Sequence, residues 1–122
     1  MDVRVSGSWF PRAICGRFIA LCAYIRMMLC ALYVVLFAGA YDYYIIDQVS
    51  FPIPILRCRS SKVLFYCHFP DKLLSVDRKN CCKKIYRFPL DLSEELTTGC
   101  AKTILVNSLF TQGIFKASFP IL

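Results

Sequence analysis

The only histidine of the chain, His68, is its most chemically suggestive residue. It follows a short apolar segment, and Pro70 stiffens the turn two residues later. A neutral imidazole at a strand end can donate to and accept from hydroxyl groups, and it can titrate near neutral pH. A histidine that merely caps the edge of a sheet fits the sequence equally well, so both roles stay open at this point.

Two further short apolar segments also end in polar residues. Asp47 and Gln48 close the first, and Asn107 and Ser108 close the second. A carboxylate such as Asp47 can accept a hydrogen bond from a hydroxyl or a cationic group, but it can also simply be solvated. Asn107 and Ser108 can help to hold an anion at the start of a helix, although these residue types more often only cap the helix.

No known catalytic motif accompanies these residues. The sequence holds no Ser-His-Asp arrangement, no phosphate-binding glycine loop and no G-x-G-x-x-G. It has no Cys-x-x-Cys, and only Cys67 stands beside the histidine, so we expect no metal and no cofactor. The eight cysteines follow an N-terminus without a basic-then-apolar leader, which favours reduced, structural thiols in a cytosolic protein.

The net charge of +7 favours a phosphate-bearing ligand or an anionic lipid surface. We expect no nucleic-acid partner, because the basic residues are scattered and no helix-turn-helix, zinc finger or aromatic RNA-binding signature occurs. One basic group can meet a diphosphate or lipid headgroups, or can be an ordinary solvated helix face. Its members are Arg78, Lys79, Lys83, Lys84 and Arg87.

Short apolar segments alternate with helix-like segments after residue 41. The predicted elements are strand 43–46, helix 51–58, strand 62–67, helix 83–99, strand 103–106 and helix 108–115. Such alternation predicts an α/β fold with a parallel sheet and helices on both sides. Ligands of these sheets bind beyond the carboxyl ends of the strands. The polar residues at those ends should therefore share one rim: Asp47, Gln48, His68, Asp71, Asn107 and Ser108.

The longest predicted helix of this part, 83–99, rests on apolar residues spaced by three and four positions. These residues are Ile85, Phe88, Leu92 and Leu96. Pro89 should kink this helix or begin a new one, and Gly99 is a suitable C-cap. The polar stretch 75–82 before it reads as a loop.

One apolar run, 18–41, carries a single charge at Arg26. As a helix it would be about 36 Å long, enough to cross a hydrocarbon core. Three arrangements stay open. The helix can lie in one leaflet with both flanks cytosolic, or it can span the membrane with Arg12 and Arg17 on the cytosolic side. It can also be an unusually apolar core helix. We favour the first, because a small domain has little room for so large a central helix.

Several motifs occur in one consistent order along the chain. They are GSWFPR at 7–12, CAYIRM at 22–27, ALYVVLFA at 31–38, DQVS at 47–50, FYCHFPD at 65–71, KIYRFPLDLSEELTTG at 84–99 and ILVNSLFT at 104–111. Through them the chain resembles the eukaryotic α-1,3/1,6-mannosyltransferases of lipid-linked oligosaccharide assembly. These are retaining glycosyltransferases of family 4 with two Rossmann-like domains, the GT-B type.

The resemblance implies an activity and a location. Members of the family transfer mannose from GDP-mannose to a dolichol-diphosphate-linked glycan at the cytosolic face of the endoplasmic reticulum membrane, without a required metal. It also implies that His68 lies against the donor sugar. The other residues at the strand ends would line the substrate cleft: Asp47, Gln48, Phe69, Asp71, Asn107 and Ser108.

The resemblance also divides the chain. Residues 1–12 would be a residual strand and linker, 13–41 the membrane-associated helix, and 42–122 an incomplete Rossmann-like domain of the N-terminal half, with Lys72 and 75–82 divergent. The opening strand, its Gly-Gly loop and the C-terminal nucleotide-sugar domain would be absent. We therefore expect a fragment that is inactive alone and folds poorly. The alternative is a small, non-catalytic membrane-associated protein that binds or regulates a full-length partner; the sequence leaves the oligomeric state open.

Overall fold

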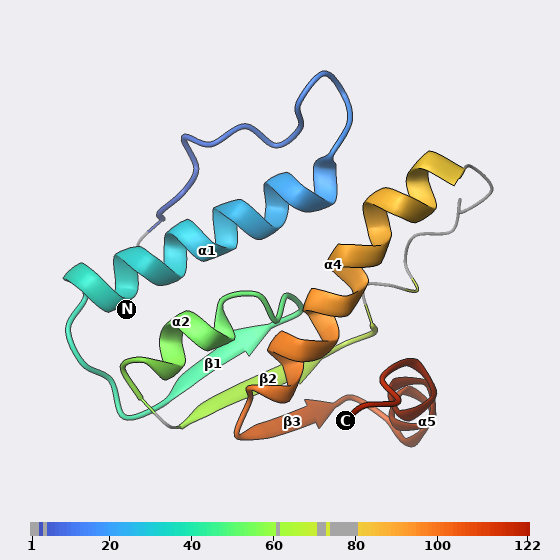
Figure 1. The fold of residues 1–122 in the computed structure, drawn as a ribbon. Coiled ribbons are helices and arrows are strands. Elements are labelled where there is room, and N and C mark those ends of the chain that lie inside the picture. Colours follow the sequence, from blue (N-terminus) through green and yellow to red (C-terminus); the bar gives the residue numbers. More distant parts are fainter. Residues whose placement is uncertain (1–2, 4, 61, 71–72, 74–80) are drawn as a thin grey trace.

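The computed structural model describes residues 3, 5–60, 62–70, 73 and 81–122, and it shows an α/β fold (Figure 1). The elements are α1 (Ile19–Phe37), β1 (Tyr44–Asp47), α2 (Ile53–Arg57), β2 (Val63–Cys67), α4 (Cys81–Gly99), β3 (Thr103–Val106) and α5 (Leu109–Ser118). All three predicted strands and their alternation with helices are confirmed. The expected loop 75–82 lies mostly outside the described residues, and its last two residues begin α4.

The three strands form a parallel sheet in the order β1-β2-β3, as expected for part of a Rossmann-like domain. β1 pairs with β2 from Tyr44 opposite Val63 to Asp47 opposite Tyr66. The pairing of β2 with β3 ends where Cys67 lies opposite Val106. Apolar, β-branched and aromatic residues dominate these strands, which suits a pleated surface that packs on one face.

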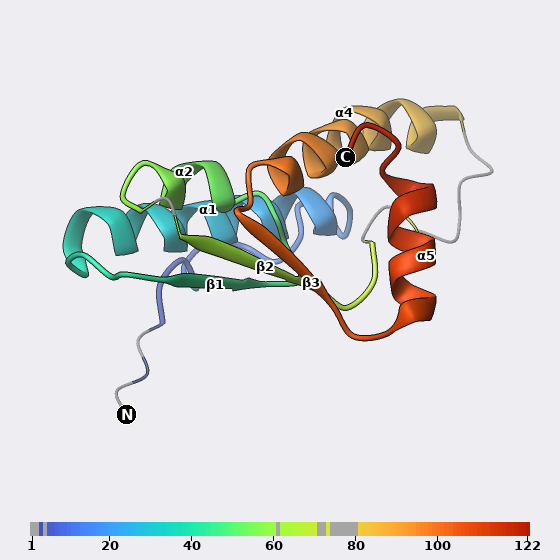
Figure 2. The same ribbon diagram turned by 90° about the horizontal axis from the view of Figure 1, so that it is seen from below.

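The expectation of helices on both sides of the sheet is wrong. Figure 2 shows α1, α2 and α4 on the same side, where the strand residues of the covered face, such as Ile46 and Phe65, are buried. The opposite face carries Ile45, which is 75% exposed, and Leu105, which is 44% exposed. The order β1-β2-β3 never reverses direction, and crossovers between parallel strands are right-handed, so both crossover helices must lie on one face.

The core lies between this covered face and the helices. Val63 and Phe65 of β2 pack with Ile53 of α2, and the core also includes Phe115 of α5 and Phe119, the C-cap residue that follows α5. The rings of Phe115 and Phe119 are 4.6 Å apart. α2 begins next to its prolines, with Pro52 as N-cap, as the sequence predicts.

α1 is attached to the fold through one part of its surface. Its Tyr24 is buried and stacks on Phe51, with ring centroids 4.1 Å apart and an interplanar angle of 13°. Among the described residues α1 is the one helix long and apolar enough to cross a membrane, and little of its surface is buried. Leu36 and Phe37 are 61% and 71% exposed, so the described part of the chain leaves this end of α1 uncovered.

The segment before α1 runs irregularly where the structure describes it, and no strand forms in residues 3 and 5–12. It approaches α1 closely at Gly7, where a Cβ atom would lie 2.8 Å from the backbone oxygen of Arg26. Gly7 also has a φ of 78°, which favours glycine. The Arg26 Nε donates to the Gly7 carbonyl oxygen at 3.3 Å, so the one charge of the apolar run meets a polar backbone group.

α4 turns its polar side inward and its apolar side outward. Arg87, Glu94 and Glu95 are 8%, 6% and 6% exposed. The apolar residues that indicate the helix in the sequence are all exposed: Ile85, Phe88, Leu92 and Leu96. The spacing therefore predicts the helix correctly but gives no information about which face meets the core.

Two sequence details of α4 can be compared with expectation. Pro89 lies inside one helix that runs continuously from Cys81 to Gly99, so it does not begin a new helix. Gly99 is the last helical residue and has no positive φ, so it is not a left-handed C-cap. A Cβ atom there would lie 2.6 Å from Leu122 Cδ2, the end of a flexible side chain that can move aside, so this contact does not require a glycine.

Candidate functional site

The carboxyl ends of the strands meet at one edge of the sheet. β1 ends at Asp47, opposite Tyr66, and Cys67 lies opposite Val106. His68 and Asn107 are the next residues, so they leave neighbouring parallel strands at the same edge. The strand arrows in Figure 1 show this common direction. The predicted convergence of polar residues is therefore present for the described part of the rim.

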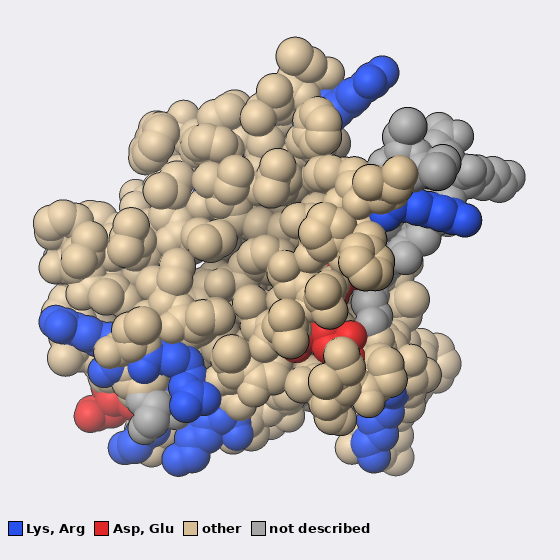
Figure 3. Space-filling view, in the orientation of Figure 1, with Lys and Arg blue, Asp and Glu red and all other residues tan. Residues whose placement is uncertain are grey.

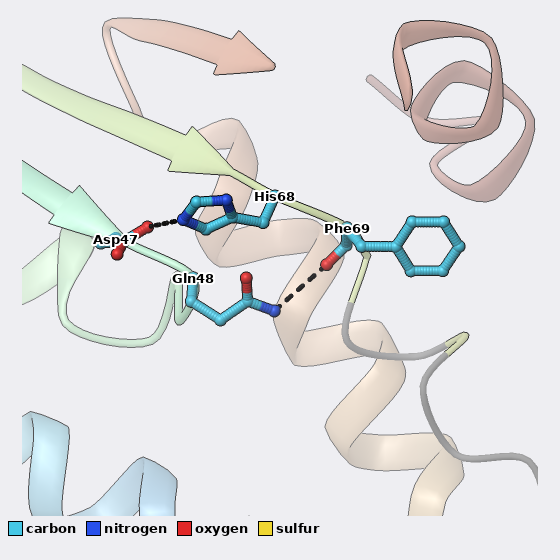
Figure 4. Close-up of polar contacts among 4 residues, drawn as sticks. All are labelled: Asp47, Gln48, His68 and Phe69. Atoms are coloured by element: carbon cyan, nitrogen blue, oxygen red, sulfur yellow. Dashed lines mark hydrogen bonds and ion pairs between the residues drawn. The ribbon is translucent and has the colours of Figure 1, made fainter. Parts of the chain in front are cut away.

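Asp47 and His68 form a direct pair (Figure 4). The His68 Nε2 lies 3.0 Å from Asp47 Oδ1, and the two side chains are 51% and 66% exposed. The Tyr66 ring meets the imidazole edge-on, with centroids 4.7 Å apart and an interplanar angle of 83°. Because the carboxylate occupies Nε2, Nδ1 is the nitrogen left for a ligand. The pair is positioned by contacts on two sides and remains open to solvent.

Gln48 links the two loops that leave β1 and β2. Its backbone N–H donates to the Tyr66 carbonyl at 3.0 Å, and its Nε2 donates to the Phe69 carbonyl at 3.2 Å. Its φ of 65° lies in the left-handed region that a non-glycine residue rarely adopts. The Phe69 ring points away from the Asp47–His68 pair (Figure 4). Gln48 and the Phe69 backbone thus support the rim, and the Phe69 side chain does not face the pair.

Asn107 and Ser108 are occupied at the start of α5. Ser108 is the N-cap, and its Oγ accepts from the Thr111 backbone N–H at 3.1 Å. The Thr111 hydroxyl donates to Asn107 Oδ1 at 2.6 Å. The predicted cap is confirmed, and the amide nitrogen of Asn107 donates no hydrogen bond to another described residue.

A buried polar contact behind the rim has no clear signal in the sequence. The Ser50 Oγ donates to the Glu94 carbonyl at 3.2 Å and lies 2.8 Å from the Thr97 Oγ1. It joins the loop after β1 to α4. Nearby, burial raises the pKa of the Cys67 thiol to about 11, and the charge of Glu94 contributes to this rise. Cys67 is therefore a neutral, structural thiol at physiological pH.

Two side chains of the basic group, Lys84 and Arg87, are described, and they have different environments. Arg87 is buried, and its Nη2 lies 3.2 Å from Asp91 Oδ1, so it is not free to meet a diphosphate. Lys84 is exposed on α4. Arg78, Lys79 and the candidate cleft residue Asp71 lie outside the described residues.

The described residues contain no group of three or more His, Cys, Asp or Glu side chains that could hold a metal. A described hollow of about 170 Å³ lies between α1, α2 and β1. Its lining is mainly apolar and includes neither Asp47 nor His68. The rim at the strand ends is therefore the candidate site, and the groups that it offers are hydrogen-bond donors and acceptors.

Fold and rim together define an α/β chain with part of a Rossmann-like parallel sheet and a polar carboxyl edge. Over nearly its whole length this chain is homologous to α-1,3/1,6-mannosyltransferases ALG2. It is 54% identical to the protein of Dictyostelium discoideum over 121 residues, 49% to that of Homo sapiens over 124, and 48% to that of Rhizomucor pusillus over 122. The predicted resemblance is thereby confirmed.

The similarity covers 98% of this chain in each of these three cases, but only 29%, 30% and 27% of the respective relatives. The chain thus spans less than a third of their length. No family model and no solved structure matches it. The chain is therefore similar to one segment of these mannosyltransferases, and the activity of the whole relatives is not assigned to these 122 residues.

Proposed function

We propose that this chain is a segment of a mannosyltransferase and forms one wall of its cleft. In the complete protein, mannose would pass from GDP-mannose to a dolichol-diphosphate-linked glycan. The observation that supports this most is the Asp47–His68 pair, which lies 3.0 Å apart and open to solvent at the carboxyl edge. In open α/β sheets this edge is where ligands bind.

The rim supports a positioning role in sugar transfer. With Nε2 held by Asp47 Oδ1, His68 offers Nδ1 to a hydroxyl of the donor sugar. Gln48 fixes the two loops through the Phe69 carbonyl, and the amide of Asn107 can donate to a second polar group. Correct orientation of donor and acceptor, together with stabilisation of the departing diphosphate, accounts for much of the catalysis expected from such a cleft.

We further propose that the 122 residues have no transferase activity by themselves. The described strands offer one rim, whereas a transfer reaction must hold a nucleotide-sugar and an acceptor at the same time. The relatives are more than three times as long, and a second domain in such proteins would supply the nucleotide-binding groups. The open face of the sheet, with Ile45 75% exposed, also predicts low stability for the isolated chain.

A segment exchange tests the proposal. The matched segment of the human relative, 49% identical to this chain, would be replaced by these 122 residues. We expect the chimera to transfer mannose from GDP-mannose to a dolichol-diphosphate-linked acceptor, and the 122-residue chain alone to transfer none. An inactive but folded chimera would contradict the role of the segment. The 122-residue chain can also be expressed alone in cells lacking the enzyme, and rescue of glycan extension there would contradict its inactivity.

The location follows from α1. We propose that the chain associates with the cytosolic face of the endoplasmic reticulum membrane, with α1 lying in one leaflet rather than spanning. α1 is apolar, yet Tyr24 stacks on Phe51 and Leu21 contacts Tyr86, so the helix stays joined to the α/β fold. Glycosylation-site tags placed after Asp42 test this orientation. They should remain unmodified, and modification would show that the chain after α1 reaches the lumen.

A non-catalytic role remains the second proposal, and the exposed sheet face favours it. Ile45 and Leu105 expose apolar area that a partner protein can cover. This alternative predicts that the short chain is stable in cells and co-purifies with a full-length mannosyltransferase. Rapid degradation of the chain when expressed alone or with that enzyme would argue against it.

A further inference from the structure

α4 exposes a stripe of large apolar side chains. Ile85, Phe88, Leu92 and Leu96 are 69%, 70%, 41% and 57% exposed. Their spacing of three and four places them on one face of the helix. In a helix that packs on a core by its apolar side, these residues would be buried. Here the described part of the chain leaves the stripe uncovered.

The opposite face of α4 explains why the helix cannot simply be turned over. It buries Arg87 beside Asp91, with 3.2 Å between Arg87 Nη2 and Asp91 Oδ1. On the same side, the Glu95 Oε1 accepts from the Ile121 backbone N–H at 2.8 Å. Exposing the apolar stripe is therefore built into the packing of α4, because rotation would break these buried polar contacts.

The stripe continues toward the start of α1. The Tyr86 ring contacts Phe18, with centroids 5.1 Å apart, and its hydroxyl accepts from the Leu21 backbone N–H at 3.3 Å. Phe18 and Ile19 are themselves 45% and 64% exposed. The two helices thus join at this contact, and each exposes apolar side chains next to it.

Basic residues flank this junction. Arg17 immediately precedes Phe18, Lys84 immediately precedes Ile85, and both are exposed. Figure 3 shows a mostly uncharged surface over α1, α2 and α4, with one patch of acidic side chains in the region of α4 and with Lys and Arg side chains at its margins. An apolar face with a cationic margin is typical of a surface that enters the headgroup region of an anionic bilayer.

We propose that the outward face of α4 is a second lipid-contacting surface, on which Ile85, Phe88 and Leu92 enter the membrane interface while Lys84 and Arg17 meet anionic headgroups. The inference rests on the proposed membrane association and extends it from one helix to two. Two contacts fix the tilt of the sheet on the membrane, whereas a single helix would allow the domain to rotate about it.

Site-specific tryptophan quenching tests the proposal directly. Trp9, the only tryptophan, is first replaced by Trp9→Phe, and Phe88→Trp is added as the probe. Ile45→Trp, on the open sheet face, is the matched control because Ile45 is similarly exposed, at 75%. Both variants are mixed with vesicles of phosphatidylcholine and phosphatidylinositol, with and without brominated acyl chains. Flotation measures how much protein is bound.

Brominated lipids should remove about half or more of the emission of the Phe88→Trp variant and much less of that of the Ile45→Trp variant. Flotation without quenching of the Phe88→Trp variant would overturn the α4 contact and leave the association through α1 intact. Absence of flotation would overturn both membrane proposals. Neither result bears on mannose transfer, which the segment exchange measures separately.

A second pair of variants keeps the net charge constant. Ile85→Gln combined with Phe88→Gln should weaken vesicle binding by about tenfold or more, whereas Ile45→Gln should leave it unchanged. Equal affinities would contradict the proposal. Dimers of the unsubstituted chain that disappear in the Ile85→Gln, Phe88→Gln variant would also contradict the proposal, since the stripe would then bind a second copy of the chain. Loss of quenching in the full-length chimera would show instead that the longer protein covers the stripe.

Discussion

The ends of β2 and β3 lie side by side at one edge of the sheet, yet their polar residues have different uses. After β2 the chain enters a loop, and His68 pairs with Asp47 while half of its side chain stays exposed. After β3 the chain enters α5 at once, and Ser108 caps the helix through the Thr111 backbone N–H. The same topological position thus holds a solvent-exposed side chain in one case and a structural cap in the other.

The difference follows from what the backbone needs after each strand. The first turn of a helix has backbone N–H groups without partners, and a nearby serine or asparagine is drawn to them. A loop makes no such demand on His68, whose position is set by Asp47 and Tyr66. We therefore expect substitutions at the β2 end to affect activity and those at the β3 end to affect stability.

The largest expected effect is at His68. In the active chimera, His68→Ala should lower kcat/KM for mannose transfer by about a hundredfold or more, because a preorganised contact to the donor sugar is lost. Ser108→Ala should lower it by less than about tenfold, since that hydroxyl is used within α5. Steady-state kinetics on both variants checks the contrast, and equal losses would remove the distinction between the two strand ends.

Cys67, at the end of β2, should be far less reactive than the exposed cysteines. A pKa of about 11 rather than 9.0 leaves about a hundredfold less thiolate at neutral pH, and the side chain is also buried. Peptide-resolved alkylation with iodoacetamide at pH 8 should label Cys15 and Cys58, which are exposed, and spare Cys67. Rapid labelling of all three would show that the β2 end opens.

The same thiol predicts the direction of a pH effect on stability. Its pKa is higher in the folded chain than the ordinary 9.0, so the folded state holds the proton more tightly. This contribution is fully present below pH 9 and is lost as the pH rises toward 11. Urea midpoints of the chimera measured across this range should fall more steeply than those of Cys67→Ala.

At the β3 end, Ser108→Ala should destabilise the first turn of α5 by about 1 kcal/mol. Hydrogen exchange of the amides around Thr111 should accelerate by about fivefold if local opening governs the exchange. Ser118→Ala, at the far end of the same helix, is the matched control and should leave these amides unchanged. An equal response to both variants would mean that the cap contributes nothing.

The smallest effect on stability belongs to the pair at the site itself. Asp47→Asn should change the free energy of unfolding by less than about 0.5 kcal/mol, because both side chains of the pair are more than half exposed. Chemical denaturation of the chimera measures this change. A large loss would mean that Asp47 supports the fold rather than the ligand.

The sequence predicts the strands and their shared edge well, because short apolar segments and helix signals alternate clearly. Ser108 is also predicted as a cap from its residue type and position. The sequence does not reveal that the helices cover one face only, since this depends on the strand order β1-β2-β3. The sequence also does not show which side of α4 packs against the core. The spacing of Ile85 and Phe88 identifies an apolar face of the helix but not what lies against that face.

The candidate site shows the same limit at closer range. Residue types and strand ends identify His68 and Asp47 as neighbours along one edge, but the 3.0 Å contact depends on register and side-chain rotamers. The left-handed conformation of Gln48 and the contact of Ser50 with Thr97 depend on residues far apart in the chain. Such contacts are specified by packing, which periodicity alone does not describe.

Protection of His68 by the donor sugar is the most direct measure of its role. In the chimera, modification of His68 by diethyl pyrocarbonate would be followed by peptide mass spectrometry without ligand, with GDP and with GDP-mannose. We expect GDP-mannose to slow the modification strongly and GDP alone to have little effect, because the mannose rather than the nucleotide covers the imidazole. Equal rates under all three conditions, at ligand concentrations that saturate the enzyme, would contradict the placement of His68 against the donor sugar.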